Sequence, residues 1–389
     1  MSHRLEDWQR DGFFVVRGAV DLELCRAMHD RAVEIARSAD GGGLIDGKFV
    51  QPEARENPAA LEPEDRVSKI FKLHRDEPVF RRFIESEPVL DWAVPMLGPD
   101  LDCFLSQFIF KNPGAMGQPW HQDSHYFRFD RTPQVGIWVA VTQATLENGC
   151  LHVLPGSHTE PRHDHVMDSR PGANLGYLEI VDHDMSESVP VLMQAGDLLV
   201  FHSHLMHRSL DNESGGVRAA MVYHLAEAGT VDQSSSPAGI NDWMPVRRRV
   251  STRIEIDAPL ERVSEVLLDG SAYGEWNPYI VKIDGAIEGG TDVVAHTCGE
   301  DGQQMAVEVR VVSTGATGMR WEGGLPDRSQ FKGDHFFELE NLPDGRTRLH
   351  HYEHFTGRLV GEIFAERLAP IRSNFERMNA ALKRCCEAG

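Results

Sequence analysis

The sequence predicts a mainly β protein with some α-helix, in which a jelly roll or barrel is followed by a second unit of mixed α and β structure. Residues 101–155 alternate short apolar runs with Gly and Pro, which is the rhythm of antiparallel strands. The pattern changes at residues 244–249, restarts after them and ends in one long helical stripe. The 389 residues suffice for two or three domains with real cores.

Each element of the first half follows from a local pattern. Residues 12–18 form an apolar run between glycines and predict a buried strand, and apolar residues at helical spacing after Val20 predict a helix. Residues 38–66 are rich in Gly, Pro, Glu and Asp, which predicts a surface loop or lid. A second polar insertion covers residues 159–190. Further strands are expected at 103–110, 135–141, 150–154, 191–202 and 217–225.

The second half begins after a predicted linker at residues 244–249, whose three arginines are interpreted as solvated charges. Residues 250–256 alternate as a strand does, and Asp257 is placed to cap a short helix after it. More strands are expected at 307–312, 318–321, 336–339 and 347–352. A long terminal helix, which Pro370 is expected to kink, carries the apolar stripe Phe364, Leu368, Ile371, Phe375, Met378 and Leu382.

Charge and composition exclude several classes of protein. The chain has 39 basic and 60 acidic residues and a net charge of −21, so we expect no nucleic-acid partner and no membrane insertion, and a small molecule as the partner. Its charged N-terminus does not resemble a signal peptide, and no run approaches the roughly 18 apolar residues of a membrane span, which predicts a cytoplasmic location. The six cysteines form no C-x-x-C pair, so neither a thiolate metal site nor a disulfide scaffold is supported.

The clearest chemical signal is the string Trp-His-Gln-Asp at residues 120–123. On a strand, residues two apart project from the same face, so His121 and Asp123 can present an imidazole and a carboxylate to one point. A facial triad of two histidines and one carboxylate holds Fe(II) and leaves positions open for other ligands. Because an H-x-D string also recurs by chance, the interpretation requires a third ligand from a distant segment.

Four downstream histidines can supply that ligand on geometry alone: His202, His204, His207 and His224. His207 is favoured by its neighbours, because Ser209 follows two residues later and Arg218 eleven residues later. After a turn, the next strand can bring the Arg218 guanidinium beside His207, where it would clamp the far carboxylate of 2-oxoglutarate. The alternative is that Arg218 pairs with Asp211 or Glu213 on a surface turn.

Residues 1 to about 245 resemble the phytanoyl-CoA dioxygenase (PhyH) family of Fe(II)- and 2-oxoglutarate-dependent oxygenases. The resemblance rests on Trp-His-Gln-Asp-Ser-His-Tyr-Phe at 120–127 and on Glu-Asn-Gly-Cys-Leu-His-Val-Leu-Pro-Gly-Ser-His at 147–158. It also rests on the series His207, Ser209, Asn212, Ser214 and Arg218. The resemblance implies that residues 1–245 form a double-stranded β-helix, or jelly roll, which is the catalytic domain.

The same resemblance implies roles for individual residues. The implied iron ligands are His121, Asp123 and His207. Ser209 and Arg218 are implied to hold the distal carboxylate of 2-oxoglutarate. Lys69, Gln107 and Trp138 are further candidate cosubstrate contacts, the alternatives being a solvated lysine, a strand-edge glutamine and a core tryptophan. Halogenating relatives lack the carboxylate ligand, so the presence of Asp123 disfavours halogenation.

Residues 250–389 resemble the START-like (SRPBCC) superfamily, a helix-grip fold of α+β type in which a curved antiparallel sheet wraps a long C-terminal helix. The resemblance rests on Ile-Glu-Ile-Asp-Ala-Pro-Leu-Glu-Arg-Val at 254–263, on Tyr-Gly-Glu-Trp-Asn-Pro-Tyr-Ile at 273–280 and on the terminal stripe. Members bind lipids, hormones or polyketides and some cyclise them, which implies a ligand-binding or cyclase-like domain. The side chains expected to line its cavity or to fill its core are Phe336, Phe337, Phe364, Phe375 and Met378.

Together these features predict a dioxygenase that uses Fe(II), 2-oxoglutarate and O2 to hydroxylate a C–H bond of a hydrophobic small molecule in specialised metabolism. Desaturation, epimerisation and cyclisation are alternative outcomes of the same site. Two other functions stay open at this point. One is a bifunctional oxygenase and cyclase, and the other is a small-molecule-binding protein with a vestigial metal site.

Overall fold

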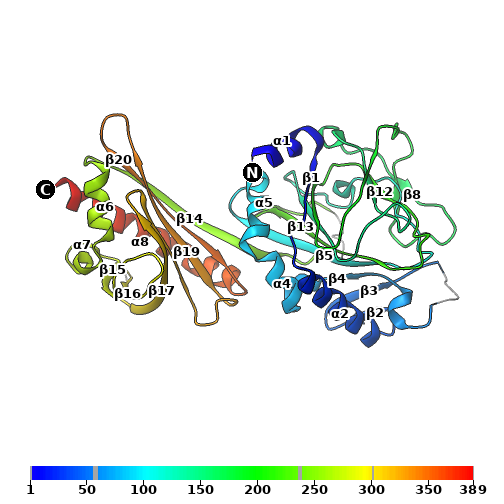
Figure 1. The fold of residues 1–389 in the computed structure, drawn as a ribbon, viewed down its shortest axis with the longest axis horizontal. Coiled ribbons are helices and arrows are strands. Elements are labelled where there is room, and N and C mark those ends of the chain that lie inside the picture. The colour runs from blue at the N-terminus through cyan, green and yellow to red at the C-terminus, as the bar shows by residue number, and fades with distance from the viewer. Residues whose placement is uncertain (1, 56–59, 235–238, 300–301, 389) are drawn as a thin grey trace. The chain divides into compact units, whose positions relative to one another are not determined.

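The computed structural model describes residues 2–55, 60–234, 239–299 and 302–388. It divides after Met244 into two compact units, each with its own core (Figure 1). The predicted fold class is confirmed, because both units are built mainly from antiparallel strands with helices added. No helix among the described residues is long and apolar enough to cross a membrane.

The main sheet of the first unit is antiparallel and runs in the order β1-β11-β6-β13-β5-β4-β3-β2. All of β6 and all but the last residue of β13 are buried, as expected of strands covered on both faces. The strands are β1 (Phe13–Val16), β2 (Gly43–Ile45), β3 (Lys48–Pro52), β4 (Val67–Phe71), β5 (Leu101–Lys111), β6 (Val135–Ala140), β11 (Leu198–His202) and β13 (Arg218–Glu227).

A smaller sheet packs against one face of the main sheet. It runs in the order β10 (Val189–Val191), β7 (Leu151–Val153) and β12 (His207–Ser209). One apolar cluster joins the two sheets, because it contains Trp138 and Val222 from the main sheet and Val153 and Val191 from the smaller one. Two antiparallel sheets around a shared core form the predicted jelly roll.

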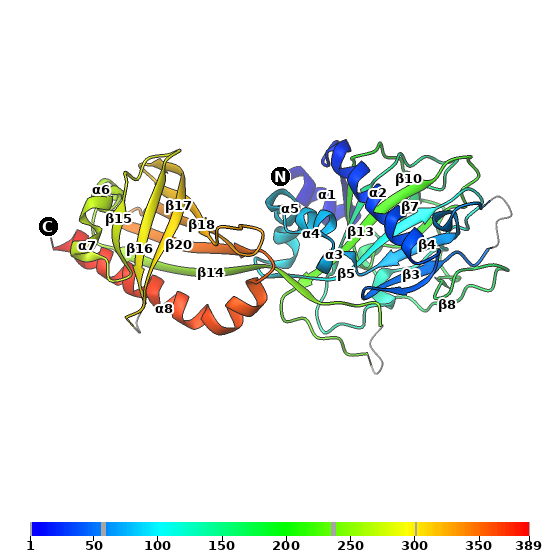
Figure 2. The same ribbon diagram turned by 90° about the horizontal axis from the view of Figure 1, so that it is seen from below.

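Helices lie over the outer side of the main sheet, where α2 packs on β4 and α4 (Figure 2). Asp21 caps α2, since its side chain accepts a hydrogen bond from the Glu23 N–H, and the predicted apolar stripe of α2 is buried except for Leu22. The helices are α1 (Ser2–Asp11), α2 (Leu22–Ser38), α3 (Leu73–Asp76), α4 (Pro78–Ile84) and α5 (Glu87–Leu97). The remaining short elements are η1 (Pro63–Arg66), η2 (Asp123–His125), η3 (Ser157–Thr159), β8 (Val166–Met167) and β9 (Leu178–Glu179).

The prediction that residues 38–66 form a surface loop or lid is wrong for residues 43–52, and residues 56–59 of that segment lie outside the described residues. It contains the hairpin of β2 and β3, and β3 pairs with β4 to extend the main sheet. The missed signal is the pair Asp46-Gly47, which adopts positive φ angles of 45° and 76° as a tight hairpin turn requires. Val50 is fully buried, so the hairpin contributes to the core.

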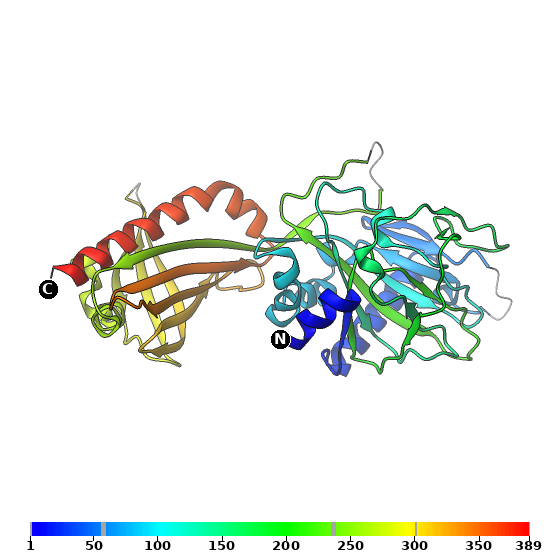
Figure 3. The same ribbon diagram turned by 90° about the horizontal axis from the view of Figure 1, so that it is seen from above.

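The second unit has one antiparallel sheet in the order β14-β20-β19-β18-β17-β16-β15. The long helix α8 runs along one face of this sheet (Figure 3). The strands are β14 (Met244–Ile256), β15 (Ile280–Asp284), β16 (Asp292–Cys298), β17 (Gln304–Gly315), β18 (Gly318–Gly324), β19 (Lys332–Asn341) and β20 (Thr347–Thr356). The helices are α6 (Leu260–Leu268), η4 (Gly270–Ala272), α7 (Tyr273–Trp276) and α8 (Val360–Glu387).

Three sequence expectations fail in the second unit. Asp257 does not cap the short helix, because Pro259 is the N-cap of α6 and no side chain makes a capping bond there. Residues 244–249 are part of the continuous strand β14 and not a solvated linker, since Met244, Val246 and Arg247 are buried. Among the aromatic residues expected in a cavity or core, Phe337 and Phe375 are fully buried. Phe336 points to the opposite face, because side chains alternate along a strand, and it stacks on Tyr352.

Candidate active site

Two chain segments far apart in the sequence meet at a buried cluster of histidine and aspartate. His207 begins β12, and His121 forms an isolated antiparallel bridge with it. The His121 N–H donates to the His207 carbonyl at 2.9 Å, and the His207 N–H donates to the His121 carbonyl at 3.0 Å. This reciprocal pair places the two imidazole rings side by side, with centroids 4.1 Å apart.

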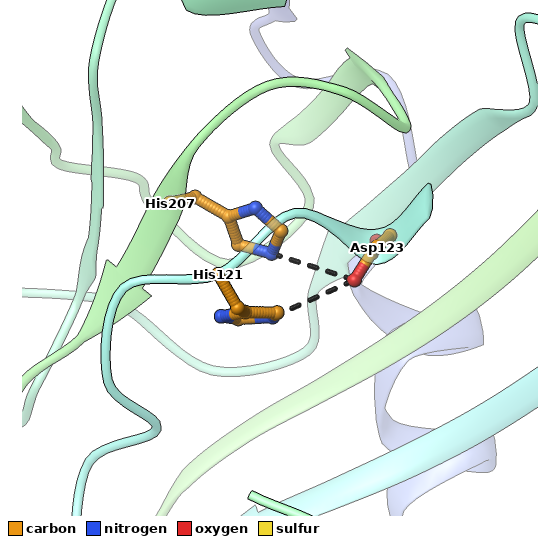
Figure 4. Close-up of side chains that lie close together, drawn as sticks. All are labelled: His121, Asp123 and His207. Atoms are coloured by element: carbon orange, nitrogen blue, oxygen red, sulfur yellow. Dashed lines mark ion pairs between the residues drawn. The ribbon is translucent and has the colours of Figure 1, made fainter. Parts of the chain in front are cut away.

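Asp123 completes the cluster (Figure 4). It begins the short helix η2, which turns the carboxylate toward the two rings. Asp123 Oδ1 lies 3.5 Å from His121 Nε2 and 3.8 Å from His207 Nε2, and the three ligand atoms lie within 4.8 Å of one another. All three side chains are buried. The H-x-D string therefore acts as predicted, although only its first half is extended and the second half is a turn.

The protonation of the two histidines is suited to a metal ion. His121 Nδ1 lies 2.8 Å from the Pro119 carbonyl, and His207 Nδ1 lies 3.0 Å from the Leu205 carbonyl, so both Nδ1 atoms carry the proton. In a neutral ring Nε2 then holds a lone pair, which in His207 lies 3.8 Å from Asp123 Oδ1 and in His121 lies 2.9 Å from Gln118 Nε2 and 3.5 Å from Asp123 Oδ1. Burial lowers the pKa of His207 to about 4, so its ring is neutral at pH 7. Three electron-rich atoms this close repel one another unless a cation lies between them, and the donor set fits the facial triad of a metal such as Fe(II).

Two more side chains that the sequence analysis did not single out for this role adjoin the cluster. Gln118 places its Nε2 2.9 Å from His121 Nε2 and accepts a hydrogen bond from Lys69 Nζ at 3.2 Å. His224, one of the alternative third ligands, is buried on β13 with its Nδ1 3.8 Å from Asp123 Oδ2. This contact is to Oδ2, whereas the two other rings lie nearest to Oδ1, and His224 is not part of the ligand group.

The main sheet brings two cations together beside this cluster. Arg218 lies directly opposite Lys111 in the register of β13 and β5, and both are buried. Lys111 Nζ donates to Ser209 Oγ at 2.8 Å and to the Leu210 carbonyl. Burial, followed by the charge of Arg218, holds the Lys111 pKa well below its ordinary value. Lys111 ends an apolar strand and belongs to no local motif, so the sequence alone does not indicate it.

Arg218 is 1% exposed, and its contacts leave donors free. One NH2 group donates to the Gly149 carbonyl at 2.9 Å, whereas Nε and NH1 have no hydrogen-bond partner within the described part of the chain. Its guanidinium lies 5.5 Å from the centre of the Trp138 ring. Burial lowers the pKa of Arg218 to about 10, so it remains charged at pH 7. The alternative interpretation, in which Arg218 pairs with Asp211 or Glu213, is wrong. The unpaired N–H groups of Arg218 could donate hydrogen bonds to a carboxylate.

The three further candidate cosubstrate contacts lie on the inner face of the main sheet. Lys69 on β4 is 9% exposed and contacts Gln118, so it is not a solvated lysine. Gln107 on β5 and Trp138 on β6 both lie opposite Val222 of β13, so the register puts them in one row across the sheet. Trp138 also belongs to the shared core, which is the role that its alternative interpretation expected.

The other histidines of the region lie elsewhere. His202 and His204 pack near each other, with ring centroids 5.2 Å apart, and neither belongs to the ligand group of Asp123. Phe127 is buried in an aromatic cluster with Phe104 and does not line an open site. The Tyr126 hydroxyl donates to the Gly176 carbonyl at 3.1 Å.

Comparison with known proteins agrees with this site. Residues 8–220 match the profile of the phytanoyl-CoA dioxygenase (PhyH) family, and residues 247–387 match the family described as polyketide cyclase / dehydrase and lipid transport. Phytanoyl-CoA dioxygenase 1 of Oryza sativa subsp. japonica is 26% identical over 253 residues, which cover 58% of this chain and 89% of the relative. Phytanoyl-CoA dioxygenase domain-containing protein 1 of Rattus norvegicus is 31% identical over 277 residues, which cover 59% of this chain and 91% of the relative.

Among solved structures, the apo form of the non-heme monooxygenase ThoJ is 24% identical and has a TM-score of 0.48. It covers 62% of this chain and 82% of its own, and at that distance the likeness carries no argument about function. The PhyH match is different in kind, because it includes every residue of the His121, Asp123 and His207 cluster and spans more than half of the 389 residues. The protein therefore belongs to the phytanoyl-CoA dioxygenase family, whose members are non-heme iron and 2-oxoglutarate-dependent oxygenases.

Proposed function

We propose that this protein is an Fe(II)- and 2-oxoglutarate-dependent dioxygenase that hydroxylates a C–H bond of a hydrophobic small molecule. One observation carries the proposal. Two imidazoles and a carboxylate converge within 4.8 Å in the same buried region as a guanidinium with two unpaired donors in the described chain. A vestigial metal site would not need to keep both the convergent lone pairs and the unpaired buried cation, since each costs stability.

In this proposal His121, Asp123 and His207 hold the iron. When bound, iron and 2-oxoglutarate supply the oxidising chemistry that uses O2, and the protein supplies placement and exclusion of water. The carbonyls of Pro119 and Leu205 fix the tautomers of the two histidines and so direct Nε2 at the metal. His224 Nδ1 lies 3.8 Å from the second oxygen of Asp123.

The cosubstrate would lie along the inner face of the main sheet. The Arg218 guanidinium, whose Nε and NH1 groups have no partner in the described chain, donates to the distal carboxylate of 2-oxoglutarate, and Lys111 lies opposite it on the neighbouring strand. Ser209 Oγ already accepts hydrogen bonds from Lys111 Nζ at 2.8 Å and from the Gln118 N–H at 3.1 Å, so its hydroxyl proton is available to the same carboxylate. Lys69 contacts Gln118, which in turn contacts His121, so Lys69 would lie on the metal side of the cosubstrate.

The surroundings of the metal cluster favour an apolar substrate. The rings of Phe127 and Phe104 have centroids 5.1 Å and 5.9 Å from that of His224, which contacts Asp123. Phe71 and Ala226 extend this apolar cluster, whereas the cations lie at the other end of β13. Because these rings are packed in the core, they surround the metal cluster with apolar groups, and we propose that the substrate is hydrophobic and that hydroxylation is the outcome.

Release of labelled CO2 from 1-14C-2-oxoglutarate tests the proposed function, because it needs no knowledge of the substrate. The wild-type chain should release CO2 in an Fe(II)-dependent reaction that hydrophobic candidate substrates accelerate. His207→Ala should abolish this release, and His204→Ala, the matched control, should keep most of it. Equal release by the wild type and His207→Ala would contradict the ligand assignment, and no release by the wild type with any substrate would favour a binding protein.

A second candidate function belongs to the second unit, which we propose binds or cyclises the same compound. A buried polar group supports it, because His335 and His351 face each other with Nε2 atoms 2.6 Å apart beneath the ring of Phe375. Asn379 on α8 holds His351 Nδ1 at 2.7 Å. Photolabelling of the full chain with a diazirine-bearing fatty acid, followed by peptide mapping, should mark residues within 247–387. Labelling confined to residues 8–220 would contradict this role.

A further inference from the structure

A second group of metal-ligand type lies outside the active site, in the polar segment 159–190. Glu160 Oε2 lies 2.9 Å from His163 Nε2 and 3.0 Å from His183 Nε2. One ligand atom from each of the three residues lies within 4.8 Å of the others. The two imidazole rings are perpendicular, with centroids 5.1 Å apart. One carboxylate oxygen therefore sits between two imidazole nitrogens.

The tautomer of His183 determines whether its Nε2 can donate a hydrogen bond to Glu160. Its Nδ1 is 3.0 Å from the Asp184 carbonyl oxygen, which only accepts hydrogen bonds, so Nδ1 carries the proton. In the neutral ring Nε2 then directs a lone pair at the Glu160 carboxylate, and the two repel each other. A metal ion between His183 and Glu160 would remove this repulsion, because both atoms could then bind to it.

We propose that Glu160, His163 and His183 form a zinc site that is separate from the iron centre. Imidazole nitrogen and carboxylate oxygen are ordinary zinc ligands, and two His, one Glu and a water give four-coordination. The side chains of Glu160, His163 and His183 are 36%, 25% and 19% exposed, which leaves room for that water. Tetrahedral bonds of about 2.1 Å separate ligand atoms by about 3.4 Å, so each contact has to open by only about half an ångström.

The surrounding hydrogen bonds give this site a structural consequence. Gln122, which stands between His121 and Asp123, accepts the His163 N–H on its Oε1 at 2.8 Å. The Gln122 Nε2 donates to the Pro161 carbonyl at 3.3 Å, and its backbone N–H donates to His165 Nε2 at 3.0 Å. Zinc would therefore fix residues 160–165 against the segment that carries two of the active-site residues, and it should stabilise that segment without taking part in the oxidation.

Zinc binding to the full chain tests the site directly. The metal-free chain is saturated with zinc sulfate, freed of excess zinc by gel filtration, and its zinc content is measured by mass spectrometry. Zinc is expected to occupy the histidine-aspartate cluster of the active site as well, so the wild type should hold two ions per chain. His183→Ala and the isosteric Glu160→Gln should each hold one ion, and His29→Ala, which alters a histidine outside both clusters, should hold two.

Two further measurements separate this site from the iron centre. Cobalt(II) should give the intense visible absorption of four-coordination in the wild type and in His207→Ala, and lose it in His183→Ala. Zinc should also raise the melting temperature of His207→Ala but not of the double variant His183→Ala/His207→Ala. Equal zinc content in the wild type, His183→Ala and Glu160→Gln would overturn the proposal. Because CO2 release reports the iron centre, that result would leave the proposed oxygenase function untouched.

Discussion

Arg218→Met should change stability and ligand binding in opposite directions. Arg218 is 1% exposed, makes one hydrogen bond to the Gly149 carbonyl and leaves Nε and NH1 without a partner in the described chain. A buried cation with incomplete hydrogen bonding costs several kcal/mol of desolvation that an apolar side chain of similar length does not. The ligand-free variant should therefore be more stable than the wild type.

The structure allows the sizes of both effects to be worked out. Relief of about 1–3 kcal/mol should raise the melting temperature of a unit of this size by several degrees, at about 2–4 °C per kcal/mol. Two charge-assisted hydrogen bonds to the cosubstrate carboxylate contribute about 1.5–3 kcal/mol each, so their loss should weaken 2-oxoglutarate binding by about 10²-fold or more. Few substitutions at a ligand site both raise the stability of the ligand-free protein and weaken ligand binding.

Differential scanning calorimetry of the metal-free chain measures the first effect, and titration of 2-oxoglutarate into the Mn²⁺-loaded chain measures the second. Arg75→Met is the matched control, because Arg75 is fully engaged with Asp242 at 2.6–3.0 Å and with the Trp243 carbonyl at 2.6 Å. Its loss leaves Asp242 unpaired, so the control should be less stable and should bind 2-oxoglutarate normally. An Arg218→Met chain that melts below the wild type and still binds the cosubstrate would refute the reasoning.

Three other outcomes are expected. Burial, with a smaller contribution from the charge of Asp334, raises the pKa of Glu353 to about 8, so the folded chain keeps a proton that the unfolded chain loses near pH 4.5. The free energy of unfolding should therefore fall as pH rises from about 4.5 to 8, by at most about 5 kcal/mol because the Glu353 side chain is 17% exposed. Glu353→Gln should melt at a higher temperature than the wild type at pH 9 but not at pH 4. Gly117→Ala should unfold at markedly lower temperature, since its Cβ would lie 2.0 Å from the Ser209 carbonyl oxygen, whereas Gly215→Ala, with open space around it, should melt as the wild type does. Removal of bound divalent metal with a chelator should lower the melting temperature reversibly, because saturation at a hundred times the Kd stabilises by about 2.7 kcal/mol, and an unchanged melting curve would argue against any metal site.

The sequence was most informative where chemistry depends on neighbours along the chain. His121 and Asp123 were found because two residues on one short segment share a side, and His207 was chosen for its spacing to Ser209 and Arg218. The structure brings the three ligand atoms together as expected. The strand assumption was only half correct, because Asp123 opens a turn and its carboxylate reaches the rings from there.

What the sequence did not reveal depends on the register between strands. Lys111 is placed by its pairing with Arg218, and Gln107 and Trp138 fall in one row only because both face Val222. A slip of one residue in β13 would turn Arg218 to the other face of the sheet, and no local pattern fixes that choice. Gln118 is similar, since its contacts with Lys69 and His121 join segments 49 residues apart.

The places where local rules fail coincide with the proposed site. A neutral His207 directs its lone pair at a carboxylate, Arg218 keeps two idle donors, and Lys111 is buried without a carboxylate partner in the described chain. In a structure that only had to fold, apolar residues at these positions would be more stable. Each failure is removed by one ligand, since a cation would satisfy the lone pairs and a carboxylate would pair with Arg218 beside Lys111. The same two ligands account for all three unfavourable features. Because the three features are independent, this agreement is the strongest physical argument that the cluster binds these ligands.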